Sequence, residues 1–102
     1  MYRYTTPTIP ITINNIDFGT VDLFRVSIKS GRVNDLFIIP ADDPRVDAEA
    51  KTITVELTQE QTAALSDGYA KLQVRIRYSN GRVQATQIVK INVQDVLDEV
   101  II

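Results

Sequence analysis

The chain has 102 residues, a formal net charge of −2, and neither cysteine nor histidine. This length fits one domain, residues 1–102, and 44% hydrophobic against 24% charged residues is the balance of a folded protein. The missing residue types exclude serine–histidine and cysteine–histidine nucleophiles, thiol redox chemistry and the usual zinc sites. No carboxylate pair or glycine-rich phosphate loop is evident, so we expect no enzyme and no cofactor.

The N-terminal half reads as strands separated by turn residues. Thr8–Ile13 alternates isoleucine with Pro10 and Thr12, and the proline indicates a sheet edge. Val21–Lys29 also alternates, with Phe24, Val26 and Ile28 on one side and Arg25, Ser27 and Lys29 on the other. Val33–Ile39 ends in the continuous run Leu36–Ile39, which predicts burial on both faces or a bulge.

The middle of the chain is a polar loop, a strand and one helical turn. Ala41–Lys51 is rich in Asp and Glu, and Thr52–Leu57 then places Ile53, Val55 and Leu57 on one face. Thr58 and Gln61 have the spacing of a helix-capping box, which predicts a short helical turn near residues 59–65. Gly68 is expected to close it in a left-handed conformation.

The last third predicts a long hairpin. Ala70–Tyr78 alternates strictly, and Asn80-Gly81 is typical of a two-residue type I′ turn. That turn pairs Tyr78 with Val83, Ile76 with Ala85, Leu72 with Val89 and Ala70 with Ile91. It also points Gln87 inward and sets Lys71 against Lys90, so we expect a bulge near Thr86–Ile88. Together the elements predict an all-β fold, an immunoglobulin-like antiparallel β-sandwich of six to eight strands.

Three stretches carry a family resemblance: Thr52–Thr62, Leu72–Val83 and Lys90–Leu97. Together they resemble the small immunoglobulin-like structural proteins of tailed phages and prophages, most nearly the N-terminal domain of upper baseplate proteins from phages of Gram-positive hosts. The resemblance implies a virion structural or baseplate protein that works by assembly. Its partners would be other phage structural proteins and further copies of itself. It also implies synthesis in the bacterial cytoplasm and a place in the virion.

Other partners are disfavoured by the composition. No apolar run approaches the roughly 20 residues of a membrane helix, and residues 1–7 lack the apolar core of a signal peptide. A near-neutral charge disfavours nucleic acid. The alternative function is a carbohydrate- or surface-binding module, whose face normally displays aromatics. With Tyr78 expected in the core, Tyr2 and Tyr4 are the chief candidates.

Two sets of residues are candidate interfaces. The first is the apolar tail, residues 94–102, together with the N-terminal tyrosines: Tyr2, Tyr4, Val96, Leu97, Val100, Ile101 and Ile102. These side chains either fold onto the chain's own core or anchor it to a neighbouring subunit. The second is the charged face of the hairpin, either a solvated face or a docking face for an acidic neighbouring subunit, an anionic glycan or nucleic acid: Lys71, Arg75, Arg77, Arg82 and Lys90.

The acidic loop is a third and weaker candidate. Asp42, Asp43, Asp47 and Glu49 are oxygen ligands of the kind that calcium prefers. Their spacing lacks the alternation and the glycine of a calcium-binding hand loop, so a solvated loop is the favoured interpretation and no metal site is expected.

Overall fold

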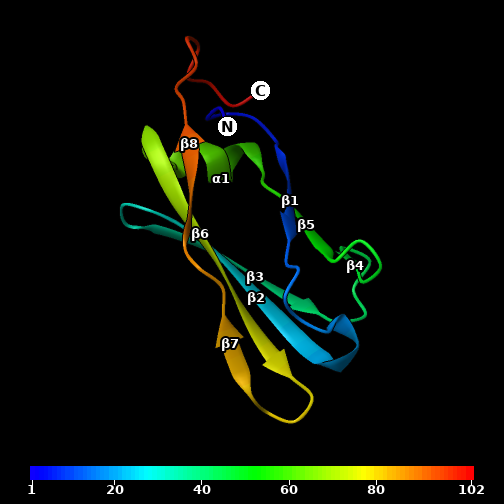
Figure 1. Ribbon diagram of the computed structural model, residues 1–102. Coiled ribbons are helices and arrows are strands. Elements are labelled where there is room, and N and C mark those ends of the chain that lie inside the picture. The colour runs from blue at the N-terminus through cyan, green and yellow to red at the C-terminus, as the bar shows by residue number, and fades with distance from the viewer.

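The computed structural model describes residues 1–102 and shows two antiparallel sheets with one short helix (Figure 1). The smaller sheet has the order β1-β5-β4, with β1 at Thr8–Thr12, β5 at Thr52–Glu56 and β4 at Val46–Asp47. The larger sheet has the order β3-β2-β6-β7, and β8 also pairs with β6. Its strands are β2 at Val21–Ser30, β3 at Val33–Pro40, β6 at Gly68–Tyr78, β7 at Val83–Ala85 and β8 at Val89–Val93. The expected all-β sandwich is confirmed.

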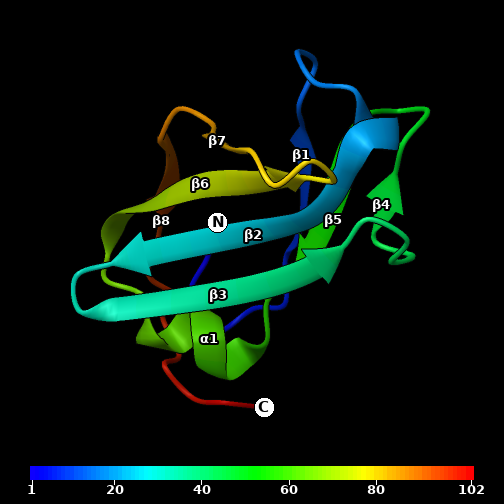
Figure 2. The same cartoon turned by 90° about the horizontal axis from the view of Figure 1, so that it is seen from below.

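The core lies between the two sheets and is built from the alternate positions that the sequence singled out. Phe24, Val26 and Ile28 of β2 are fully buried, as are Ile53 and Val55 of β5. On β6 the buried positions are Ala70, Leu72, Val74 and Ile76. Strands β1 and β5 lie behind the larger sheet and run across its strands (Figure 2). The opposite, outer face of the larger sheet is covered by no second layer.

Helix α1, Gln59–Ala64, is the short helical turn expected near residues 59–65. The Thr58 hydroxyl accepts from the Gln61 amide at 3.1 Å, and the Gln61 side chain accepts from the Thr58 amide at 2.8 Å, so the capping box is confirmed. The helix ends at Leu65. Gly68 has φ +120° but is the first residue of β6, so its expected role in closing the helix is wrong. A second short turn, η1, spans Phe18–Thr20. No helix here has the length and apolar character needed to span a bilayer.

The hairpin turn differs from the prediction. Tyr78 N–H donates to the Arg82 carbonyl at 2.8 Å, and the Tyr78 carbonyl accepts from Gly81 N–H at 2.9 Å. Gly81 has φ +87°, whereas Asn80 does not adopt a positive φ, which a type I′ turn requires at both central residues. The loop is therefore three residues long, with glycine in its left-handed position. The predicted two-residue turn is wrong.

This longer turn shifts the strand pairing by one residue in the half of the hairpin next to the turn, where β6 pairs with β7. Val83 pairs with Arg77 rather than with Tyr78, so the valine faces outward. The far half has the predicted register, with Ala70 opposite Ile91. Between the two halves, three residues of the return strand face two residues of β6, and the expected bulge at Thr86–Ile88 absorbs the difference.

Strand β3 also corrects an expectation. The run Leu36–Ile39 alternates instead of being buried on both faces: Ile39 is fully buried, while Leu36 and Ile38 are 42% and 54% exposed. The physical reason is position, because β3 is an edge strand and its outer face has no layer above it.

Candidate functional site

Four of the five predicted basic residues share the outer face of the larger sheet. Lys71, Arg75 and Arg77 point outward because the alternate positions of β6 are buried. Lys90 of β8 is the direct cross-strand partner of Lys71. Arg82 lies in the hairpin turn, one residue before the outward-facing Val83, and the one-residue shift takes it off this face.

Strand β2 adds two cations to this face that are not among the five predicted basic residues. Arg25 pairs directly with Arg75, and Lys29 pairs directly with Lys71. The alternation of β2 showed that these side chains face away from the core. It did not show that β2 lies beside β6, a pairing between strands distant in the sequence. We call the assembled set the basic face: Arg25, Lys29, Lys71, Arg75, Arg77 and Lys90.

The basic face is poorly neutralised. Arg77 forms an ion pair with Asp22, with 2.6 Å between Nη2 and Oδ2. The other five cations of the face form no ion pair. Lys90 instead lies 4.7 Å from the ring centre of Tyr69. Like charges directly opposite one another destabilise a sheet, so this surface fits an anionic partner.

Apolar side chains lie among these cations. Leu23 and Val83 line a shallow hollow of about 180 Å³ together with Arg25, Arg75 and Arg77. Leu36 and Ile38 of the neighbouring edge strand lie partly exposed on the same face. The chemistry of this surface therefore suits a partner that presents both carboxylates and aliphatic side chains.

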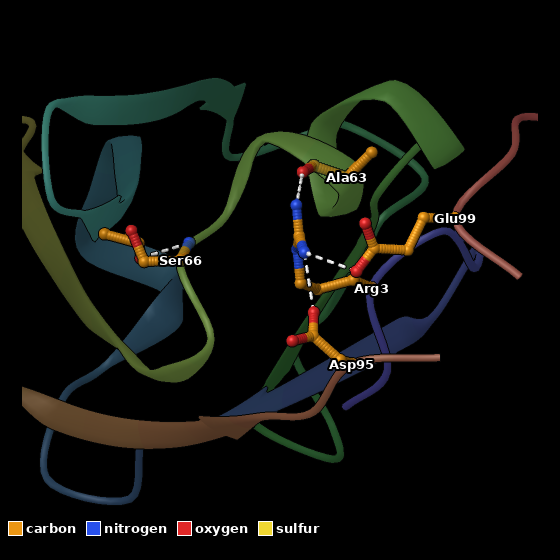
Figure 3. A network of polar contacts seen from close by, with 6 residues as sticks. Arg3, Ala63, Ser66, Asp95 and Glu99 are labelled. Atoms are coloured by element: carbon orange, nitrogen blue, oxygen red, sulfur yellow. Dashed lines mark hydrogen bonds and ion pairs between the residues drawn. The ribbon is translucent and has the colours of Figure 1, made fainter. Parts of the chain in front are cut away.

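The second candidate site is built where the two ends of the chain meet. Residues 1–3 run alongside β8: Arg3 N–H donates to the Gln94 carbonyl and Gln94 N–H donates to the Met1 carbonyl, each at 2.8 Å. The Arg3 guanidinium then contacts Asp95 at 2.6 Å and the Ala63 carbonyl of α1 at 2.5 Å (Figure 3). Arg3 thus joins both chain ends to the helix.

A second anchor holds the far end of residues 94–102, which we call the C-terminal segment. The Gln59 side-chain amide donates to the Ile102 carbonyl at 2.5 Å and accepts from Ile102 N–H at 2.9 Å. This pair ties Ile102 to the first residue of α1. The segment is therefore held at Gln94 by backbone hydrogen bonds, at Asp95 through its side chain, and at Ile102 through its backbone.

Most apolar side chains of this segment are exposed to solvent. Leu97, Val100, Ile101 and Ile102 are exposed, whereas Val96 is half-buried. The segment forms neither a strand nor a helical turn packed on the chain's own core. At the other end of the chain Tyr2 is exposed, and Tyr4 is half-buried with the Arg3 guanidinium 5.3 Å from its ring centre.

The acidic loop has partners of its own. Arg45 donates two side-chain hydrogen bonds to Asp43, and its backbone N–H donates a third. These bonds lower the pKa of Asp43 to about 2, the side-chain bond contributing most. Asp47 accepts from the Ala50 amide. No group of three or more acidic side chains converges as metal ligands do.

Comparison with known proteins adds no identity: no protein-family model matches the sequence, and no curated protein is found as a relative. The functional argument therefore rests on the basic face and the C-terminal segment.

Proposed function

We propose that the protein is a non-catalytic structural component that acts by protein–protein assembly, as its resemblance to tailed-phage structural proteins implies. Its partners in this proposal are further copies of itself and other structural proteins of the particle. The observation that carries the proposal is the C-terminal segment, which Arg3 and Gln59 hold at its two ends while most of its apolar side chains lie in solvent.

The exposed aliphatic side chains of the C-terminal segment favour binding to another subunit. Burial of one large aliphatic side chain contributes roughly 1.5–3 kcal/mol, and the segment offers Leu97, Val100, Ile101 and Ile102 together. Association normally costs the ordering of flexible segments. Here Arg3 and Gln59 already hold the segment at two points, so less of that cost remains to be met on binding.

Sedimentation velocity tests the proposal, with the protein studied from about 10 μM to about 1 mM. We expect the weight-average sedimentation coefficient to rise with concentration. Leu97→Ser combined with Ile101→Ser should suppress that rise. The matched control is Ile88→Ser, which changes a similarly exposed side chain in the β7–β8 bulge and should leave the rise intact. A wild-type chain that stays monomeric over the whole range overturns the proposal.

A carbohydrate-binding role is the second candidate, favoured by one observation. Tyr69 and Tyr2 are both exposed and flank β8, Tyr69 opposite Asn92 and Tyr2 opposite Gln94. Tyr78, expected in the core, is half-buried and donates to Gln84. Titration of the ¹⁵N-labelled protein with an oligogalacturonate tests this role. Shifts confined to the tyrosine pair support it, and an unchanged spectrum removes it.

A further inference from the structure

We propose that the basic face receives the C-terminal segment of a second copy of this chain, so that copies associate head to tail. This inference rests on the proposed assembly function and names the partner for that function. It joins the two candidate surfaces, which the sequence treats as separate features, into the two halves of one repeating contact.

Charge complementarity is the first argument. Asp98 forms no ion pair, and the Glu99 carboxylate lies 3.7 Å from the Arg3 guanidinium, a long contact. On the receiving face, Arg25 and Arg75 are direct cross-strand neighbours without a carboxylate partner. Arginine and carboxylate pair in a planar, two-pronged geometry, so an acidic segment laid across these two arginines would relieve their mutual repulsion.

Apolar complementarity is the second argument. Leu97 is entirely exposed and precedes Asp98, while the hollow beside Arg25 and Arg75 is lined by Leu23 and Val83. Its volume is about 180 Å³. A cavity of about 150 Å³ in another protein accommodates benzene, so this hollow is large enough for one leucine side chain. Leu97 entering the hollow would place Asp98 beside the arginines.

The third argument is that the contact must form between copies. The molecule is elongated, with a longest dimension of 47 Å. The C-terminal segment lies at one end of it, near α1 and the N-terminus, whereas the turn between β6 and β7 lies at the other end (Figure 1). The hollow is near that turn, because Arg77 and Val83 line it. Because Ile102 is held on Gln59 of α1, the segment stays at the end of the molecule away from its own hollow.

A donor at one end and an acceptor at the other define a heterologous contact. Such contacts propagate into rings or filaments unless one surface is blocked. This property gives a test that a two-fold symmetric dimer would fail. The face variant is Arg25→Ser with Arg75→Ser, and the segment variant is Leu97→Ser with Asp98→Ser. Each variant disables one half of the contact and keeps the other.

Sedimentation velocity of the face variant and the segment variant, separately and mixed, tests the head-to-tail contact. Each variant alone should be a monomer, with self-association weakened at least about tenfold. Their equimolar mixture should form a 1:1 complex and no larger species. The control, Arg32→Ser with Arg82→Ser, removes two exposed cations outside the basic face and should assemble like the wild type. Circular dichroism confirms that each variant is folded.

The outcomes separate the two proposals. If the wild type assembles but the face variant assembles equally well, the contact lies elsewhere, and only the head-to-tail inference is overturned. The same holds if both variants are monomeric alone and stay monomeric when mixed. If the wild type itself is monomeric at every concentration, the assembly function fails, and the inference fails with it.

Discussion

The hydroxyl of Thr62 makes an unusual connection between the N-terminal segment and helix α1. The residue is fully buried although it is polar. Its Oγ1 accepts from the Thr5 amide at 3.1 Å and donates to the Thr5 carbonyl at 2.8 Å, with the Gln59 carbonyl also within 3.2 Å. One side chain therefore satisfies both backbone groups of Thr5, as a neighbouring strand would.

Replacing Thr62 with valine separates two physical predictions. Valine has nearly the same shape and is more apolar, so burial alone predicts a small gain in stability. The hydrogen bonds predict the opposite, because Thr5 would keep an amide and a carbonyl without partners. Each such group costs about 1–3 kcal/mol when buried. Thr5 itself is only half-buried, so we expect Thr62→Val to lower the free energy of unfolding by about 2 kcal/mol.

Urea denaturation followed by circular dichroism measures this change, and thermal unfolding should show a fall in Tm of about 10 °C. Thr62→Ser is the matched control, because it retains the hydroxyl and removes only a methyl group. It should cost about 1 kcal/mol, less than the valine variant. A valine variant as stable as the wild type, or more stable than the serine variant, would refute the hydrogen-bond reasoning.

Three further predictions follow from the electrostatics. Burial raises the pKa of Asp35 above its ordinary value of 3.8, so the free energy of unfolding should fall as the pH rises above 3.8. In denaturant titrations, Asp35→Asn should therefore be more stable than the wild type at neutral pH and equally stable near about pH 3. An NMR titration should give the Asp43 carboxyl a pKa of about 2, and Arg45→Ala should raise that pKa. The stability that the ionised Asp43 contributes should be lost as the pH falls from 3.8 toward 2. Lys71 lies between Lys29 and Lys90, so Lys71→Gln should raise the unfolding free energy by about 0.5 kcal/mol at low salt and by almost nothing near about 1 M NaCl.

The sequence predicted local features that depend on a repeating pattern. Alternation in the sequence predicts β2, β5 and β6 and the buried side of each, since a period of two decides which side chains meet the core. The spacing of Thr58 and Gln61 likewise located the start of α1. The bulge at Thr86–Ile88 was predicted because an uninterrupted register brought Gln87 into the core.

What the sequence did not predict depends on pairings between distant segments. The sequence around Arg25 and Lys29 does not indicate that β2 lies beside β6. The pairing of Arg25 with Arg75 and of Lys29 with Lys71 therefore cannot be predicted from it. The dipeptide Asn80-Gly81 suits two loop lengths, and the additional loop residue in the structure places Arg82 off the basic face. Nothing local indicates the role of Thr62, because its partner Thr5 is 57 residues away in the sequence.

The placement of charge connects these findings to the proposed assembly. The chain as a whole is slightly acidic, yet one face of the larger sheet gathers six cations, and the C-terminal acids lie at the end of the molecule opposite the hollow beside Arg25 and Arg75. Mixing the two signs on every surface would have avoided the repulsion along the rows of β2, β6 and β8. Separating them costs stability in the isolated molecule, but the two ends of neighbouring copies then attract each other. The basic face keeps like charges opposite one another, and the C-terminal segment keeps aliphatic side chains in solvent. Both features are expected of a subunit that buries these surfaces against neighbouring copies.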